Sequence, residues 1–279
     1  SSSFVQIKFL KNFTFRQNLG LGYNVQDRKS YYGRETQEGK TPINGKASVG
    51  HNTWKSLTAE SILTYDNTFA KIHHVNVMGA FTLESSNWTN DQQVATNFPD
   101  DLTGANDMGR ALDKATLSGD KGQQRLASFL GRVNYTLADK YILTASFRSD
   151  GSSKFTDENK WATFLSGALA WRASEEKFIK DLNIFSNLKF RISYGETGNQ
   201  GIGSYRINSQ LDTANFPFGG SLSSGAADVA WRGPVDPNIK WETTKQWNAG
   251  IDFGWFKNRL TLTVDFYWKK TRDLLQEVI

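Results

Sequence analysis

The three histidines are the side chains best suited to acid–base or metal chemistry, and their positions argue against a shared metal site. His73 and His74 are adjacent, so on an extended strand they point to opposite faces, and His51 lies in another segment. Ser186 and Lys189 match a Ser-x-x-Lys nucleophile pattern by residue type. That chemistry needs a helical turn, whereas Lys189 begins a strand-like segment. We therefore predict no catalytic residues, no enzyme activity and no metal site built from histidines.

One polar segment could hold a cation. Its oxygen-bearing side chains are Asn97, Asp100, Asp101, Asn106 and Asp107. Hard cations such as Ca²⁺ favour oxygen ligands of this kind. The spacing fits no defined calcium loop, so solvated loop charges are the simpler interpretation. We expect no cofactor, with a calcium ion in this segment as the alternative.

Alternation of apolar and polar side chains at every second residue dominates the chain and is the mark of a β-strand with two different faces. It is clearest in 247–255 and 258–268, and recurs in 141–148 and 188–194. Noisier alternation indicates six further strands, at 3–10, 13–26, 52–66, 72–88, 123–137 and 160–173. Most of these ten segments have ten or more residues, and a tilted strand needs about 9–11 residues to cross a bilayer. The sequence thus predicts an all-β, transmembrane antiparallel β-barrel.

The links between the expected strands alternate between tight and long. The tight ones lie at Lys11-Asn12, Ala70-Lys71, 138–140 and Lys257-Asn258; the long ones span 27–46, 89–121 and 196–241, with a shorter one at 153–159. Outer-membrane barrels have this layout, with the long loops outside. All five prolines fall in the long links, as expected if proline is excluded from strands: Pro42, Pro99, Pro217, Pro234 and Pro237. On the tight side, 174–183 is expected to form a short helix beginning at Ser174.

Three groups of side chains are candidates for function. Tryptophans near strand ends are expected to form the aromatic girdle of the membrane: Trp161, Trp171, Trp247, Trp255 and Trp268. Polar strand residues are expected to face the lumen, where they could also simply contact water and a plug: Arg132, Asn134, Arg148, Lys189, Arg191, Asn248 and Asp252. Residues of the 196–241 link could bind substrate or contact a lid, or only pack the loop: Asn199, Gln200, Tyr205, Phe216, Phe218 and Trp231.

Composition narrows the class of protein. The chain has 279 residues, no cysteine and a net charge of +5 that is spread without a basic block, so nucleic acid is not an expected partner. It contains no apolar run of 18 residues, which excludes a transmembrane helix. The segment Ser1 to Phe4 has no features of an export signal. We expect an internal fragment of a longer protein.

Five blocks of sequence, in order, closely resemble the SusC/RagA-like TonB-dependent transporters of the bacterial outer membrane. They are YILTASFRSDGSSKF at 141–155, the run from Trp161 to Trp171, FIKDLNIFSNLKFRISYGETGNQGIG at 178–203, IKWETTKQWNAGIDFG at 239–254 and NRLTLTVDFYWKKTRDLL at 258–275. The resemblance covers essentially the whole chain and is strongest after residue 125.

The resemblance implies a 22-stranded barrel closed by an N-terminal plug, with residues 1–279 forming about ten of its later strands. The plug, the TonB box, the N-terminal extension and the final strands would lie outside this chain. It also implies import of oligosaccharides or peptides, driven by the TonB-ExbB-ExbD complex through the missing N-terminal part and assisted by a SusD-like lipoprotein. The alternatives from the residues alone are a passive outer-membrane porin and a soluble carbohydrate-binding β-domain.

Overall fold

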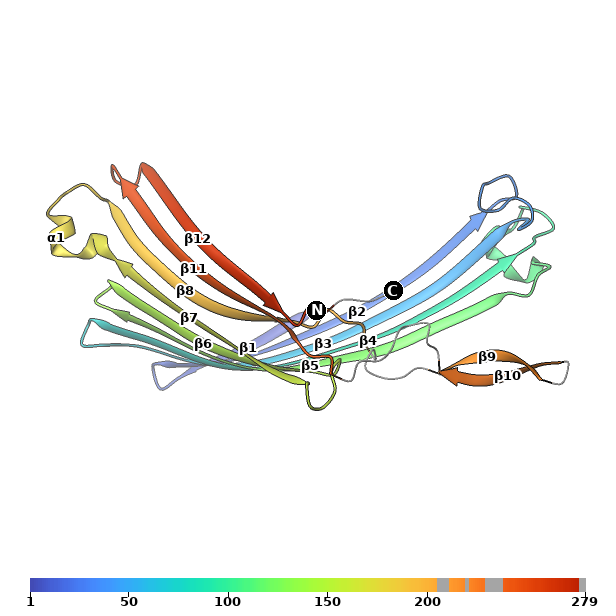
Figure 1. The fold of residues 1–279 in the computed structure, drawn as a ribbon, viewed down its shortest axis with the longest axis horizontal. Coiled ribbons are helices and arrows are strands. Elements are labelled where there is room, and N and C mark those ends of the chain that lie inside the picture. Colours follow the sequence, from blue (N-terminus) through green and yellow to red (C-terminus); the bar gives the residue numbers. More distant parts are fainter. Residues whose placement is uncertain (205–210, 219–220, 229–237, 276–279) are drawn as a thin grey trace. The chain divides into compact units, whose positions relative to one another are not determined.

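The computed structural model describes residues 1–204, 211–218, 221–228 and 238–275, and only the backbone of 211–218 and 221–228. Within this part, ten strands form one sheet in the order β1-β2-β3-β4-β5-β6-β7-β8-β11-β12 (Figure 1). Their bounds are β1 Ser2–Phe9, β2 Phe13–Tyr32, β3 Lys46–Phe69, β4 His73–Thr96, β5 Thr116–Leu137, β6 Tyr141–Ser152, β7 Trp161–Arg172, β8 Asn187–Asn199, β11 Glu242–Trp255 and β12 Leu260–Arg272. The predicted all-β class and the ten wall strands are confirmed.

Most of the wall strands are longer than the sequence predicts, and four of them have 20 residues or more. β2 to β5 have 20, 24, 24 and 22 residues, and most of their additional residues lie at the long-loop ends. A strand crosses the hydrocarbon with about 9–11 residues, and beyond it both faces meet water. Alternation therefore ends before the strand does, as in the polar run Asp27 to Ser30. Within the described residues, no helix has the length and apolar character needed to cross a membrane.

The tight links are where the sequence places them. β1–β2, β3–β4 and β5–β6 are joined by three residues each, and β11–β12 by four. In every one of them, consecutive non-glycine residues take positive φ, for example 48° and 63° at Ala70 and Lys71. Left-handed backbone of this kind turns the chain sharply while keeping the twist of the paired strands.

The link between β7 and β8 contains a 3₁₀ turn, η3 (Ala173–Glu175), and a four-residue helix, α1 (Lys177–Lys180). The expected helix exists, but it does not begin at Ser174. Glu176 occupies the N-cap position, and Ser174 is buried within η3. Glu176 makes no cap hydrogen bond because its carboxylate binds the neighbouring strand ends, accepting from Lys140 Nζ (2.9 Å) and from the hydroxyl of Tyr141 (2.7 Å).

The sequence suggested that the long link after β8 is irregular throughout, but the structure shows regular structure within it. It contains a separate two-stranded ribbon of β9 (Leu211–Phe218) and β10 (Ser221–Asp228). Pro217 lies inside β9, opposite Leu222, so the expectation that all five prolines avoid strands is wrong. Every strand of a two-stranded ribbon is an edge strand, and edge strands tolerate proline.

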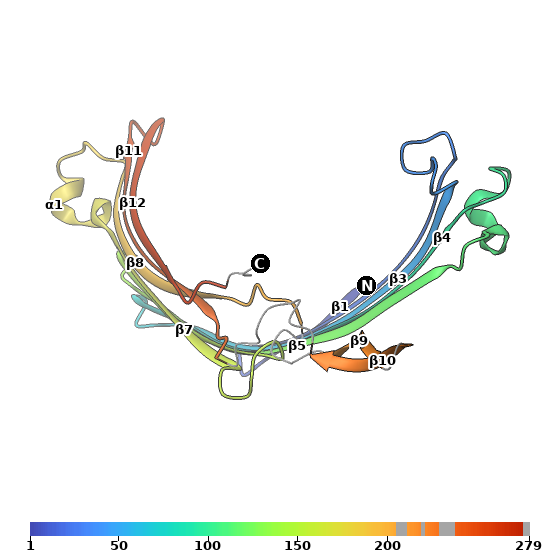
Figure 2. The same cartoon turned by 45° about the vertical axis from the view of Figure 1, so that its right-hand side comes forward.

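The chain divides into two compact units. Unit 1 comprises Ser1–Ser3, Leu19–Thr58 and Glu84–Gln124; unit 2 comprises Phe4–Asn18, Ala59–Leu83 and Arg125–Ile279. The buried core of unit 1 lies beneath its loops and contains Ala47, Ala95, Phe98 and Ala105. The aromatic core of unit 2 contains Phe155, Phe164 and Trp241. In unit 2, α1 and the β11–β12 turn lie at the same end of the strands (Figure 2).

Candidate functional site

The strand register of unit 2 sorts side chains onto two faces. Directly opposed residues of an antiparallel pair point to the same face, and successive residues alternate. Following the partners from β5 to β12 through pairs such as Arg132↔Ser146, Ala170↔Arg191 and Ser193↔Asn248 places all seven predicted lumen residues on one face. We call this the polar face. It carries Arg132, Asn134, Arg148, Lys189, Arg191, Asn248 and Asp252.

A charged network crosses β8, β11 and β12 on the polar face. Arg191 donates from Nε and Nη2 to the two carboxylate oxygens of Asp252, both at 2.9 Å. The same Nη2 reaches Asp265 at 3.1 Å, and Thr263 donates to Asp252. A bidentate guanidinium–carboxylate pair is among the stronger protein hydrogen-bonding arrangements. This network fixes three neighbouring strands to one another through their side chains.

Smaller polar contacts continue across β5 and β6. Arg148 Nε donates to both carboxylate oxygens of Asp150 at 2.8 Å, and Arg148 Nη2 donates to Ser128. Thr144 donates to Asn134 at 2.9 Å. Arg132, by contrast, is exposed and has no hydrogen-bond or ion-pair partner among the described residues. The polar face therefore combines fixed contacts with at least one cation that can meet a solute.

The opposite face, which we call the apolar face, carries the five predicted girdle residues. Register pairs such as Trp247↔Trp268 and Tyr141↔Trp171 place Trp161, Trp171, Trp247, Trp255 and Trp268 on it. Trp161, Trp247 and Trp268 are 49%, 49% and 59% exposed, whereas Trp171 and Trp255 are half-buried. On the same face, Phe266 is 71% and Leu262 50% exposed. No second layer covers this face in the part of the chain that the structure describes, as expected of a wall that meets lipid.

Two loops of unit 2, the one after β6 and the one after β8, are joined by hydrogen bonds at the long-loop end of the sheet. Ser152 Oγ donates to Gln200 Oε1 at 2.5 Å, and Lys154 Nζ donates to the Gln200 carbonyl at 3.3 Å. Burial lowers the pKa of Lys154. Gln200, predicted to contact substrate or a lid, is thus engaged with a neighbouring loop. Asn199 is exposed and donates to Glu242 at 3.4 Å.

An aromatic cluster beneath these loops escaped the sequence prediction. Trp241 is 6% exposed, its ring lies 5.1 Å from that of Phe155 and 5.8 Å from that of Phe164, and its indole N–H donates to the carbonyl of Lys160 at 3.0 Å. The only signal in the sequence was a tryptophan directly before a strand. Of the other predicted loop residues, Tyr205 and Trp231 lie outside the described residues, as do the side chains of Phe216 and Phe218.

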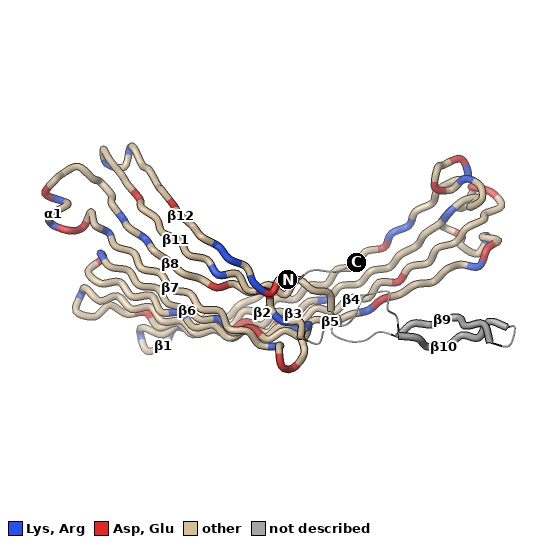
Figure 3. Tube along the Cα trace, in the orientation of Figure 1, with Lys and Arg blue, Asp and Glu red and all other residues tan. Residues whose placement is uncertain are grey.

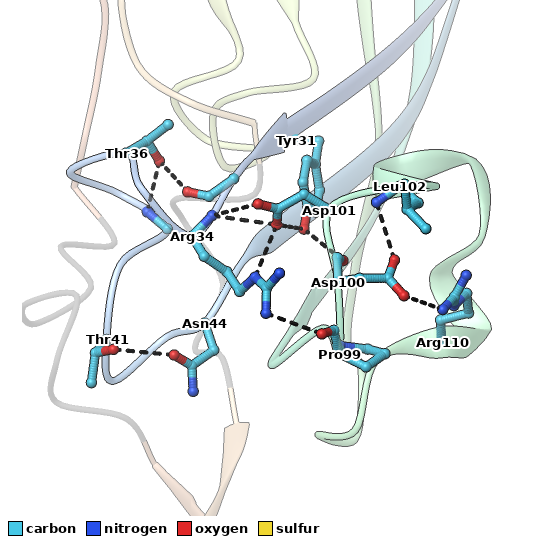
Figure 4. Close-up of polar contacts among 12 residues, drawn as sticks. Tyr31, Arg34, Thr36, Thr41, Asn44, Pro99, Asp100, Asp101, Leu102 and Arg110 are labelled. Carbon is cyan, nitrogen blue, oxygen red and sulfur yellow. Dashed lines mark hydrogen bonds and ion pairs between the residues drawn. The ribbon is translucent and has the colours of Figure 1, made fainter.

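The loops of unit 1 form a second polar cluster (Figure 4). Tyr31 donates to Asp101 Oδ1 at 2.7 Å, Arg34 pairs with the same carboxylate at 3.4 Å, and Asp100 pairs with Arg110. The hydrogen bond from Tyr31 is the main cause that lowers the pKa of Asp101. A calcium ion in this segment would have to displace these partners.

The structure gives each histidine a separate partner. His73 lies 2.7 Å from the Tyr135 hydroxyl, and His51 lies 2.5 Å from Asp27. His74 contacts Thr68 at 3.1 Å. Across the described residues, no group of three or more His, Asp or Glu side chains is arranged to hold a metal ion.

Comparison with known proteins agrees with this geometry. Residues 4–279 match the family model described as TonB dependent receptor-like, beta-barrel. TonB-dependent receptor P26 of Formosa agariphila is 34% identical over 84% of this chain and 23% of its own length. TonB-dependent receptor SusC of Bacteroides thetaiotaomicron is 43% identical over 55% of this chain and 15% of its own length.

Solved structures show the same fold. The structure of the RagAB peptide transporter superposes with a TM-score of 0.85 at 23% identity, covering 99% of this chain and 30% of that one. The chain thus spans less than a third of the length of these relatives and neighbours. Its two-faced sheet, its alternating links and the family match over residues 4–279 lead to one identification: the chain belongs to the TonB-dependent receptor family, as part of the outer-membrane β-barrel of a SusC/RagA-like member.

Proposed function

We propose that the protein containing this chain imports oligosaccharides or peptides across the outer membrane, driven by TonB, together with a SusD-like surface lipoprotein. The observation that carries the proposal is the two-faced sheet, with seven predicted lumen residues on one face and five tryptophans on the other. Such a wall separates lipid from a wet interior. The family match and the similarity to TonB-dependent receptor SusC support import driven by TonB, and the fold shared with the RagAB peptide transporter favours peptides as one class of cargo.

The polar face would line the path of the cargo. Arg191, Asp252 and Asp265 already satisfy one another, so they shape the lumen wall without binding solute strongly. Exposed Arg132 is the better candidate for contact with a passing solute or the plug. The long loops would face outside, where the Trp241 cluster and the Gln200 contacts keep those of unit 2 folded, and where cargo and lipoprotein would first meet the protein. No covalent step is involved.

Uptake by cells that produce the full-length parent protein tests the proposal. Labelled oligosaccharides and labelled peptides are offered separately, with and without TonB and with and without a protonophore. We expect one cargo class to enter, and its entry to stop when TonB or the proton-motive force is removed. Removal of the SusD-like lipoprotein should reduce uptake at low cargo concentration.

A passive porin gives the opposite result. Uptake would continue without TonB, and the purified protein would conduct ions steadily in a planar bilayer. Recovery of the parent protein from the soluble fraction without detergent would contradict both barrel functions and favour the soluble β-domain.

A further inference from the structure

Two cations lie on the apolar face of unit 2, at the long-loop end of β12. Because side chains alternate along a strand, Trp268, Lys270 and Arg272 share this face, whereas Lys269 lies on the polar face. Figure 3 shows Lys and Arg residues concentrated in this half of β12. Cations are costly on a surface that meets hydrocarbon, so their height relative to the bilayer decides what they can bind.

The two cations lie beyond the aromatic band. Trp268 is paired in register with Trp247, and such aromatic residues mark the membrane interface. Lys270 and Arg272 follow Trp268 by two and four residues. With a rise of about 3.3 Å per residue and a tilt of about 45°, they stand about 5 and 9 Å higher than the indole. Headgroups occupy roughly this depth, since they add about 5–8 Å on each side of the hydrocarbon.

The local charge balance leaves these cations available. Lys270 lies directly opposite Lys245, and like charges in that relation repel. Lys245 is neutralised by Glu196, with Nζ 2.7 Å from the carboxylate oxygen. Lys270 and Arg272 are exposed and have no ion-pair or hydrogen-bond partner in the part of the chain that is described. Because Glu196 is engaged with Lys245, an anion from outside the described residues would be the counterion of Lys270 and Arg272.

We propose that Lys270 and Arg272 bind a phosphate group of an anionic glycolipid in the outer leaflet, with Trp268 against the lipid below it. The inference rests on the proposed placement of the long loops outside the cell. The planar guanidinium of Arg272 matches two phosphate oxygens, and the Lys270 ammonium supplies a second point of charge. Glycolipid held there stays at the wall of the barrel and is not cargo.

The test measures lipid retained by the full-length parent protein, purified in detergent and analysed by native mass spectrometry. The probes are phosphorylated lipid A and its dephosphorylated form. The test variant carries Lys270→Gln and Arg272→Gln. Each removed cation should weaken binding about fivefold, so phosphorylated lipid A should bind about 30-fold more weakly. The dephosphorylated form should bind weakly to wild type and variant alike.

Three comparisons make the result specific. Lys257→Gln with Lys269→Gln removes the same charge from the same hairpin, but from the turn and the polar face, and should leave binding unchanged. The exchange Lys270→Arg with Arg272→Lys keeps both charges and should bind within about threefold of wild type. Inorganic phosphate at the concentration of the lipid should not displace it.

The proposal is overturned if the Gln variant binds phosphorylated lipid A as wild type does, or if the control variant loses it equally. It is also overturned if dephosphorylated lipid A binds as tightly as the phosphorylated form, or if free phosphate competes equally well. Heat-modifiable mobility on a denaturing gel confirms that each variant is a folded barrel. Uptake measured in the same variants separates the two proposals, because unchanged lipid binding with intact TonB-dependent uptake refutes only the lipid site.

Discussion

Trp241 offers the sharpest test of how the loops are held. Its 6% exposed side chain packs between Phe155 and Phe164, and its indole N–H binds the Lys160 carbonyl. Replacing a buried tryptophan by alanine typically costs about 3–5 kcal/mol, since contacts are lost and a cavity remains. Trp241→Phe keeps most of the packing and loses chiefly one hydrogen bond, worth about 1 kcal/mol. Local opening of the 153–160 loop should therefore be about 100-fold or more favoured in the alanine variant, and only several-fold in the phenylalanine variant.

Limited proteolysis of the full-length parent protein in detergent measures this opening. Cleavage in 153–160 should accelerate in the order wild type, Trp241→Phe, Trp241→Ala, while heat-modifiable mobility of the barrel persists. Trp247→Ala is the matched control, because it removes a 49% exposed tryptophan from the apolar face of β11, outside the Trp241 cluster. Equal cleavage rates for wild type and Trp241→Ala, or equal acceleration by Trp247→Ala, would refute the role of this cluster.

Three further predictions concern the wall and its tight end. Arg191→Ala leaves Asp252 without its bidentate partner, and because both side chains are partly exposed we expect a loss of about 1–3 kcal/mol, measured as a lower urea midpoint in liposomes; an unchanged midpoint would show that the pair contributes nothing. Glu176, whose pKa is lowered chiefly by the hydrogen bond from Lys140, stabilises the β7–β8 link above its ordinary pKa of 4.5 and loses that effect as the pH falls through the lowered value. Proteolysis of this link should accelerate on acidification in wild type, and show no such dependence in Glu176→Gln. A fluorophore attached at Phe266→Cys should be quenched by a lipid-borne reagent, and one attached at Tyr267→Cys by an aqueous reagent. Residues 1–279 contain no other cysteine that would take the label. The reverse pattern would show that the assignment of the two faces is inverted.

Period-2 alternation was enough to predict the sheet of unit 2 because each face there meets one medium. Leu262 and Phe266 alternate with Thr263 and Asp265, so the register follows from hydrophobicity, and the opposed pairs place Arg191 beside Asp252. The sequence could not predict the distances within the charged network, since they depend on the stagger between two strands whose paired residues, Arg191 and Asp252, are 61 positions apart in the chain.

Prediction failed where side chains meet water on both sides or where contacts join distant loops. The long-loop ends of β2 to β5 lack alternation, and the ribbon containing Pro217 lies inside a segment that composition marks as loop. The Trp241 cluster joins residues from three separate segments, which no local pattern reveals. Gln200 was singled out as an amide able to bind sugar hydroxyls, but the structure uses it to fasten two loops.

The tight and the long links also differ in how well they tolerate insertions and deletions. Turns of three or four residues with positive φ at several positions leave no slack, so an added residue there would shift one strand against the next and exchange its two faces. Lengthening a long loop costs little, since the entropy of loop closure grows only slowly with length. If the proposed import function holds, recognition of new nutrients could therefore evolve by insertion and deletion in the long loops, while the strands keep their register.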